Sequence, residues 1–134
     1  RNQFLVIFKR RSCDVSIELK IMRAHRLKTY IWVQIQQRYC ERNNLPIYIL
    51  EKGDIDAGVV IIKINLLDGR CKVFSQIVRP NGEPAWQTWS TNGVPVLESE
   101  ADTYIAKQKQ IDPDIWVIEV EDMKGLFKLD EVVI

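Results

Sequence analysis

The chain has 134 residues and a mass of 15.7 kDa, with 46% hydrophobic and 28% charged residues. This is the size of one compact domain, and the composition is too apolar for a wholly disordered chain. Nineteen basic and eighteen acidic side chains leave a formal net charge of +1, which favours no polyanionic partner, and no apolar run approaches the ~18–20 residues that span a bilayer, so no membrane partner is expected.

Residues 1–21 differ in character from the chain that follows. The apolar run Phe4–Phe8 precedes the basic triplet Lys9–Arg11, which is the reverse of the order in a secretory signal. Met22 comes just before the first strongly periodic segment. We therefore expect residues 1–21 to be an upstream extension or flexible arm, with a strand or amphipathic arm as the alternative, and residues 22–134 to form a single α+β domain.

From residue 27 the chain begins with a helix and then changes to strands. Apolar residues recur every four positions, which predicts an amphipathic helix over 27–43 with one core face; they are Leu27, Ile31, Ile35 and Tyr39. Alternating apolar residues then predict four strands, with two-residue hairpin turns at Asp68-Gly69 and Asn81-Gly82. The expected strands are 47–51, 58–67, 70–79 and 85–91.

A second helix and two further strands complete the expected fold. Ser99, with Asp102 three residues later, resembles a helix N-terminus, and Asp112-Pro113 ends that helix near Ile111. Strands over 115–121 and 126–129 follow. The order α-β-β-β-β-α-β-β predicts an α+β fold with a mostly antiparallel sheet of five to six strands, built as a hairpin meander, and both helices on one face.

The residues that usually signal chemistry are sparse. Cys13, Cys40 and Cys71 are too widely spaced for a zinc knuckle or a disulfide framework, and we interpret them as free thiols in a reducing cytoplasm. The single histidine, His25, lies among basic residues, which disfavours a role as general base. No phosphate-binding glycine loop, zinc-protease motif or serine-nucleophile motif occurs. We therefore predict no catalytic residue and no cofactor.

Charge is unevenly distributed along the chain. Residues 1–45 contain ten basic and three acidic side chains, whereas residues 46–134 contain nine basic and fifteen acidic ones. A basic arm containing Arg23, Arg26 and Lys28 would be the part to contact nucleic acid. The only basic triplet has a single aromatic neighbour, so a nucleic-acid partner is not favoured.

The candidate acidic site consists of four carboxylates and one lysine: Asp54, Asp56, Lys63, Glu119 and Glu121. The first two lie in a glycine-flanked loop, 53–58, ahead of the lysine, and this partly resembles the pattern of metal-dependent nucleases. Ile61 stands where such a pattern needs its second metal ligand, so a tight loop whose acids bind their own backbone is the favoured interpretation. The two glutamates share one strand face, either as paired carboxylates or as a solvated face. Whether a metal binds is left open.

Tryptophan supplies the candidate interface. Trp86 and Trp89 are three residues apart, so they cannot both point the same way from a regular strand. Exposed tryptophan is enriched at binding hot spots, and ordinary core packing is the alternative for both residues. Trp32 and Trp116 are expected in the core.

Four segments of the chain, in order, match a known family. They are Arg26–Val33, Gly53–Gly58, Lys63–Gly69 and Asp112–Asp122. On these motifs the chain resembles, over about residues 22–129, a family of small alphaproteobacterial proteins classified as a domain of unknown function. The resemblance supports Met22 as the start of the protein, and it implies no substrate, cofactor or catalytic residue.

Together these observations favour a small cytoplasmic protein that acts as a protein-binding or assembly module without catalysis. Its partner would be an unidentified protein, or a second copy bound through a sheet edge or the Trp86/Trp89 region. The alternative is a metal-dependent hydrolase or nuclease that uses loop 53–58 and Lys63.

Overall fold

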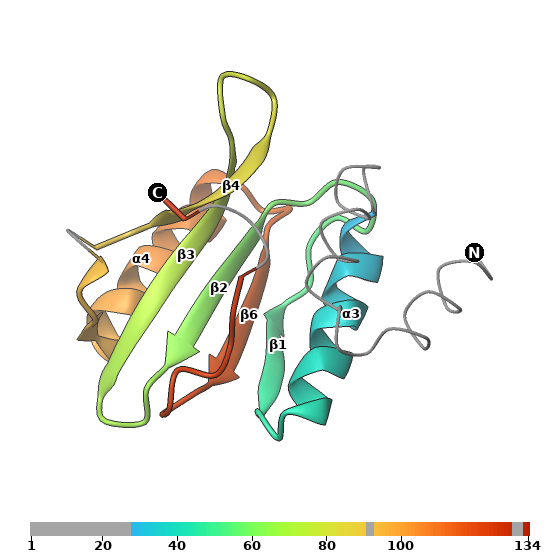
Figure 1. Cartoon of the computed structure of the whole chain (residues 1–134). Coiled ribbons are helices and arrows are strands. Elements are labelled where there is room, and N and C mark those ends of the chain that lie inside the picture. The colour runs from blue at the N-terminus through green and yellow to red at the C-terminus, as the bar shows by residue number, and fades with distance from the viewer. Residues whose placement is uncertain (1–27, 91–92, 130–132) are drawn as a thin grey trace.

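The computed structural model describes residues 28–90, 93–129 and 133–134. That part of the chain folds into two helices and six strands around one open sheet (Figure 1). The expected extension 1–21 lies outside the described residues. The elements are α3 Thr29–Arg42, β1 Ile47–Glu51, β2 Val60–Asn65, β3 Arg70–Val78, β4 Pro84–Thr88, β5 Val96–Leu97, α4 Glu98–Ile111 and β6 Trp116–Glu121.

The sheet confirms the predicted α+β class and its mostly antiparallel pairing. Its strand order is β1-β6-β2-β3-β4, and the short β5 pairs with the start of β3. The hairpins β2–β3 and β3–β4 are antiparallel as predicted. The meander is interrupted, however, because β6 lies between β1 and β2 and runs parallel to β2. The connection between β1 and β2 is long enough to leave room for this later strand.

Both hairpins turn through three residues rather than two. The Leu66 N–H donates to the Arg70 carbonyl at 3.0 Å, which encloses residues 67–69, and the loop 80–82 is closed in the same way. Gly69 and Gly82, the last residues of these loops, both have φ of +88°. A three-residue hairpin loop places its left-handed residue last, and glycine adopts that conformation without a steric cost.

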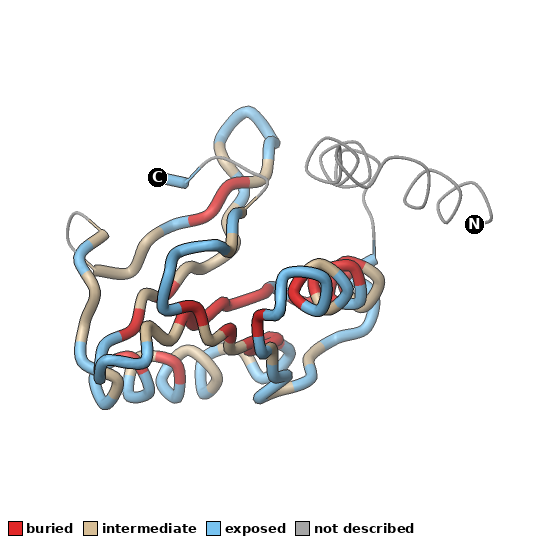
Figure 2. Tube along the Cα trace, turned by 60° about the horizontal axis from the view of Figure 1, so that its bottom comes forward, coloured by how far each residue is buried: buried red, intermediate tan, exposed pale blue. Residues whose placement is uncertain are grey.

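The two helices cover opposite faces of the sheet, so the prediction of both helices on one face is wrong. Along β2, Val60, Ile62 and Ile64 belong to the core cluster under α3. Ile61, between them, belongs to the cluster under α4. Figure 2 shows the buried strands as a central layer with a helix on either side. Central strands that are apolar on both faces need cover on both.

Each face has its own core. The α3 side is the larger and contains Trp32, Val33, Cys40, Leu45, Val60, Ile62, Ile64, Trp86, Trp116, Ile118 and Val120. The α4 side contains Ile61, Cys71, Val73, Ala101, Ile105, Ile115 and Val117. Burial raises the pKa of the Cys40 thiol to about 12 and that of Cys71 to about 11, so both stay neutral at physiological pH. Both are free, as predicted, while Cys13 lies outside the described residues.

Helix α4 begins differently from the prediction. It starts at Glu98, and the Leu97 N–H before it donates to the carboxylate of Glu100 at 3.3 Å. Ser99 therefore lies inside the helix rather than capping it. Asp102, expected to complete the cap, instead reaches an ion pair on the sheet.

The segment expected as a last strand, 126–129, is irregular. The buried carboxylate of Asp122 accepts the backbone N–H groups of Leu126 and Phe127, both at 2.8 Å, and these bonds fold the chain back after β6. Val133 then forms an isolated parallel bridge with Trp86 on β4.

Candidate interaction surface

The glycine-flanked loop 53–58 uses its acids locally. One Asp54 carboxylate oxygen accepts the N–H groups of Asp56 and Ala57 at 3.2 and 2.8 Å. The Asp56 carboxylate lies 3.7 Å from the Lys28 ammonium, and both side chains are exposed. In the described ranges no three histidine, cysteine or acidic side chains are grouped so that they could hold a metal ion.

Removal of the Asp54 carboxylate is expected to destabilise this loop without changing any metal dependence. Asp54→Ala loses two backbone hydrogen bonds and should cost about 1–2 kcal/mol in free energy of unfolding, as loss of a cap does. Asp54→Asn keeps an acceptor oxygen and should cost less. Thermal unfolding with and without millimolar Mg²⁺ or Mn²⁺ checks both points. A rise in melting temperature with metal that Asp54→Asn abolishes would contradict this structural role.

The same loop also closes the N-terminus of α3. The Tyr30 N–H donates to the Ile55 carbonyl at 3.0 Å, and the Thr29 N–H donates to the Asp56 carbonyl at 3.2 Å. These are among the backbone donors that a helix leaves unpaired at its start. The loop is held from below by the chain before β6, since the Trp116 indole N–H donates to the Asp54 carbonyl at 2.7 Å. Three of the four family-like segments therefore meet at one structural junction.

Lys63 is buried beneath the first turns of α4, where it is surrounded by acids. Its ammonium lies 2.9 Å from Glu98, 2.7 Å from Asp102 and 3.8 Å from Glu119, although the side chain is only 3% exposed. Asn65 also donates to Glu119, at 2.9 Å. Of the five predicted acidic-site residues, only Lys63 and Glu119 come together.

The two missing acids of this cluster come from the helix. Glu98 and Asp102 are four residues apart, so they lie on one helical face. The signal for them was a lysine at the centre of an otherwise apolar strand, which requires a buried counter-charge. Burial lowers the pKa of Lys63, but the hydrogen bonds from Asp102 and Glu98 outweigh it and raise the pKa above 10.5. A permanently protonated amine is neither a nucleophile nor a base, so the cluster ties α4 to the sheet.

The remaining predicted site residues lie apart from that cluster. Glu121 is half-buried at the end of β6, where its backbone N–H donates to the Pro46 carbonyl at 2.9 Å. Lys28 is exposed at the start of α3. Arg23, Arg26 and His25 lie outside the described residues, so the nucleic-acid hypothesis stays a prediction.

The two tryptophans point to opposite faces, as their spacing requires. Trp86 is fully buried in the α3-side core, and its ring centroid lies 5.6 Å from that of Trp32. Trp89 is half-buried on the α4 side and stacks on Tyr104, with centroids 4.5 Å apart. The structure therefore corrects the expectation for Trp86, which packs the core and offers no surface to a partner.

The outer edge of β1 is the open edge of the sheet. In the part of the chain that the structure describes, no strand pairs with this edge. Three consecutive apolar side chains are exposed along it: Tyr48 at 48%, Ile49 at 39% and Leu50 at 46%. At the other end of the sheet, Ile134 occupies the edge of β4, where its N–H donates to the Trp86 carbonyl at 2.8 Å.

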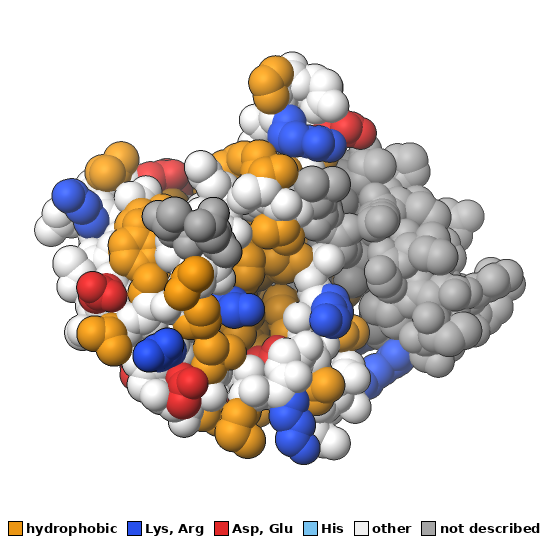
Figure 3. Space-filling view, turned by 60° about the vertical axis from the view of Figure 1, so that its left-hand side comes forward, with side chains coloured by type: hydrophobic (Ala, Val, Ile, Leu, Met, Phe, Trp, Pro, Cys, Tyr) orange, Lys and Arg blue, Asp and Glu red, His pale blue; other side chains and the backbone are white. Residues whose placement is uncertain are grey.

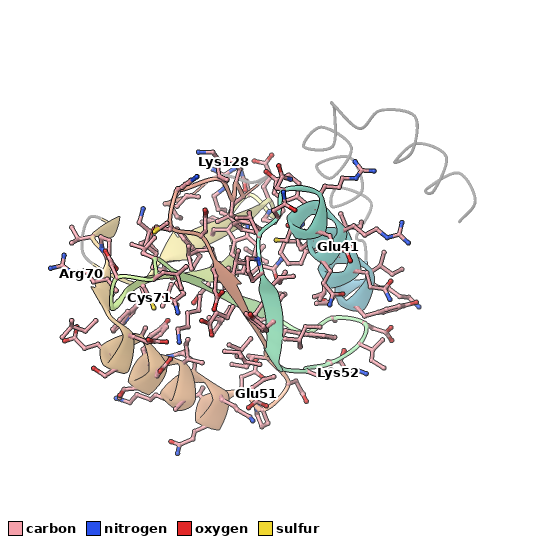
Figure 4. All side chains as sticks on the ribbon, turned by 90° about the horizontal axis from the view of Figure 1, so that it is seen from below. Glu41, Glu51, Lys52, Arg70, Cys71 and Lys128 are labelled. Carbon is pink, nitrogen blue, oxygen red and sulfur yellow. The ribbon has the colours of Figure 1, made fainter. Side chains whose placement is uncertain are left out.

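The neighbourhood of β1 leaves this edge accessible from the α4 side. Seen from below (Figure 4), α4 begins near Cys71 and ends near Glu51, the last residue of β1. Lys109 in its last turn forms an ion pair with Glu51. The helix packs mainly on β3 and β5 and reaches β1 only at its end, so Tyr48 and Leu50 stay exposed.

Other exposed apolar residues do not form such an edge. Figure 3 views the molecule from the left of Figure 1, and hydrophobic side chains gather on that face, with Lys and Arg among them. Elsewhere in the described chain, Val78, Val94 and Leu97 are exposed, at the end of β3, in a loop and before α4. None of these three lies in a run of exposed apolar residues on an unpaired strand.

Comparison with known proteins places these features in a family. The family model described as "Protein of unknown function (DUF1491)" matches residues 27–130. A crystal structure of a DUF1491 family protein from Caulobacter crescentus is 35% identical, with a TM-score of 0.71, over 81% of this chain and 99% of that one. An NMR structure of a DUF1491 family protein from the same organism is 34% identical, with a TM-score of 0.69, over 81% of this chain and 97% of that one.

A more distant structure shares the fold. Protein Atu0922 from A. tumefaciens is 22% identical, with a TM-score of 0.62, over 72% of this chain and 86% of that one. A search of the curated proteins gave no match. Within the described residues, neither helix has the length and apolar character that crossing a membrane requires.

Proposed function

Because the chain belongs to the DUF1491 family, which is described only as of unknown function, we propose its role from its geometry. It is a protein-binding module that accepts a strand of another chain along the outer edge of β1. The observation that carries this proposal is the run of three exposed apolar residues, 48–50, on the unpaired edge of the sheet.

Sheet edges in natural proteins are normally protected against pairing. Charged residues, proline, bulges or covering loops serve this purpose, because an edge presents a row of unpaired N–H and C=O groups. In β1 no charged residue occurs before Glu51, and the protective features are limited to its two ends. Addition of a strand would satisfy the backbone groups and cover the exposed side chains at the same time.

The buried groups support a role in binding rather than in chemistry. The carboxylates of the loop 53–58 bind their own backbone or Lys28, and Lys63 is held in its charged form by three acids. Two buried thiols, Cys40 and Cys71, support a reducing compartment such as the cytoplasm.

The proposal is tested by affinity capture with matched edge and control variants. The purified full chain, Ile49→Lys and Val78→Lys are each immobilised and exposed to an extract of the native cells. Both substitutions add one charge at an exposed apolar position, but only the first lies on β1. A protein held in stoichiometric amount by the wild type and Val78→Lys, and about tenfold less by Ile49→Lys, supports the proposal. A second copy of this chain counts as such a protein.

Two results would overturn the proposed function. One is that the wild type retains no protein, including a second copy of itself. The other is that Ile49→Lys retains the same protein as well as Val78→Lys does. Circular dichroism and the melting temperature confirm that both variants are folded before the comparison is made.

A further inference from the structure

We infer that the partner at the β1 edge is a second copy of this chain, whose own β1 pairs with the first in antiparallel register about Tyr48. This inference rests on the proposed function, because it names the occupant of the same edge. It follows from which backbone groups face outward, from where the regular edge begins and ends, and from the sequence between those limits.

The outward backbone groups belong to Ile47 and Ile49. In an antiparallel pair, hydrogen-bonded positions alternate with positions whose N–H and C=O point away from the neighbour. The Glu121 N–H donates to the Pro46 carbonyl, and Tyr48 is opposite Glu119, so positions 46 and 48 face β6. The N–H and C=O groups of Ile47 and Ile49 therefore face the open edge.

The regular edge is symmetric about Tyr48. It begins at Pro46, which has no N–H to donate, and it ends at Leu50, where the register with β6 shifts. Both limits lie two residues from Tyr48. The residues between them read Ile-Tyr-Ile in either direction. An antiparallel copy therefore places Ile47 of each chain opposite Ile49 of the other, with all outward groups of both residues paired.

The side chains are compatible with a two-fold axis at Tyr48. In this register the two Tyr48 residues form the non-hydrogen-bonded pair, in which cross-strand side chains lie closest. Leu50 of each chain lies opposite Pro46 of the other. No charged residue occurs over 46–50, so no like charges meet. The same patch serves both chains, which is the condition for a closed dimer.

The register is tested by disulfide trapping. Tyr48→Cys and Leu50→Cys are made in a Cys13→Ser background, in which the other thiols, Cys40 and Cys71, are fully buried. The two positions are almost equally exposed, at 48% and 46%, so random collision would cross-link both alike. The proposed register brings together the two thiols introduced at position 48, one from each chain, but separates those introduced at position 50 by about 13 Å along the strands.

The expected result is a Tyr48→Cys disulfide dimer that forms about tenfold faster than the Leu50→Cys dimer. Light scattering of the wild type at micromolar concentration should give twice 15.7 kDa, and Ile49→Lys should give the monomer mass at an unchanged melting temperature. Equal cross-linking of the two cysteine variants, or a wild-type monomer at every concentration, overturns the inference. If the extract experiment still finds a β1-dependent protein, only the identity of the partner is wrong; if it finds none, the proposed function fails too.

Discussion

Gly53→Ala should leave the chain unable to fold stably. A Cβ atom at residue 53 would lie 2.2 Å from the Asp114 carbonyl oxygen and 2.6 Å from the Ile115 carbonyl carbon, and both are backbone atoms. The loop would have to move away, which breaks the bond from the Asp54 N–H to the Asp114 carbonyl. We expect a loss of about 3–5 kcal/mol, a large part of the ~5–15 kcal/mol that stabilises a typical domain. Urea unfolding followed by circular dichroism measures it.

A second glycine provides the control for this substitution. Gly82 has a φ of +88°, but a Cβ there would meet no atom within 4 Å. Gly82→Ala should therefore cost only the strain of the left-handed conformation, about 1 kcal/mol. Equal losses for the two variants would show that the 53–58 loop is not clamped against the chain before β6.

Lys63→Ala is the second substitution with a large expected effect. It leaves Glu98, Asp102 and the mostly buried Glu119 facing one another without a counter-charge. Removal of one partner from a buried ion pair typically costs about 3–5 kcal/mol, and we expect a loss in that range. Lys107→Ala, at an exposed position of α4, removes the same charge as a control and should change stability by less than about 0.5 kcal/mol.

The pH dependence separates the charge of Lys63 from its packing. Since the pKa of this lysine is raised above 10.5 in the folded state, its charge contributes stability that is fully present below pH 10.5 and is lost as pH rises through the folded value. The difference in unfolding free energy between wild type and Lys63→Ala should stay constant from pH 7 to about 10 and then shrink. A decline already complete by pH 9 would mean that the ion pairs are not what holds α4.

Local features of the fold were predictable from the sequence. The boundaries of β1 and β6 follow from alternation of apolar residues, and both hairpins follow from turn dipeptides whose glycine adopts a positive φ. These signals depend on neighbours in the chain. The length of the hairpin loops was missed, because Asp-Gly and Asn-Gly fit both two-residue and three-residue loops.

The core face of α3 was predicted only in part. Ile35 is buried, but Ile31 and Tyr39 are half-buried, and Gln36 and Cys40 are buried instead. An α-helix has 3.6 residues per turn, so a stripe of residues spaced by four drifts around the helix and leaves a flat core surface. Positions 29, 32, 33, 36 and 40 follow the core face more closely.

The candidate site was less predictable because it depends on pairings between distant segments. Lys63 and Glu119 meet only because β6 inserts beside β2, and Glu98 and Asp102 reach them only because α4 covers that face. The same insertion separates β1 from β2 and leaves β1 at the open end of the sheet. No local periodicity specifies which strand becomes an edge.

The insertion of β6 also has a consequence for synthesis of the chain. The strands β2, β3 and β4 find partners among their immediate neighbours in sequence, but β1 finds its partner only in β6, from the opposite half of the chain. Pairings of such long range form late, since the intervening chain must first be ordered. During translation α3 and β1 therefore emerge well before Trp116–Glu121 exists. Until then the residues Ile47–Leu50 have both edges unpaired, and this stretch is where a nascent chain would need protection from aggregation.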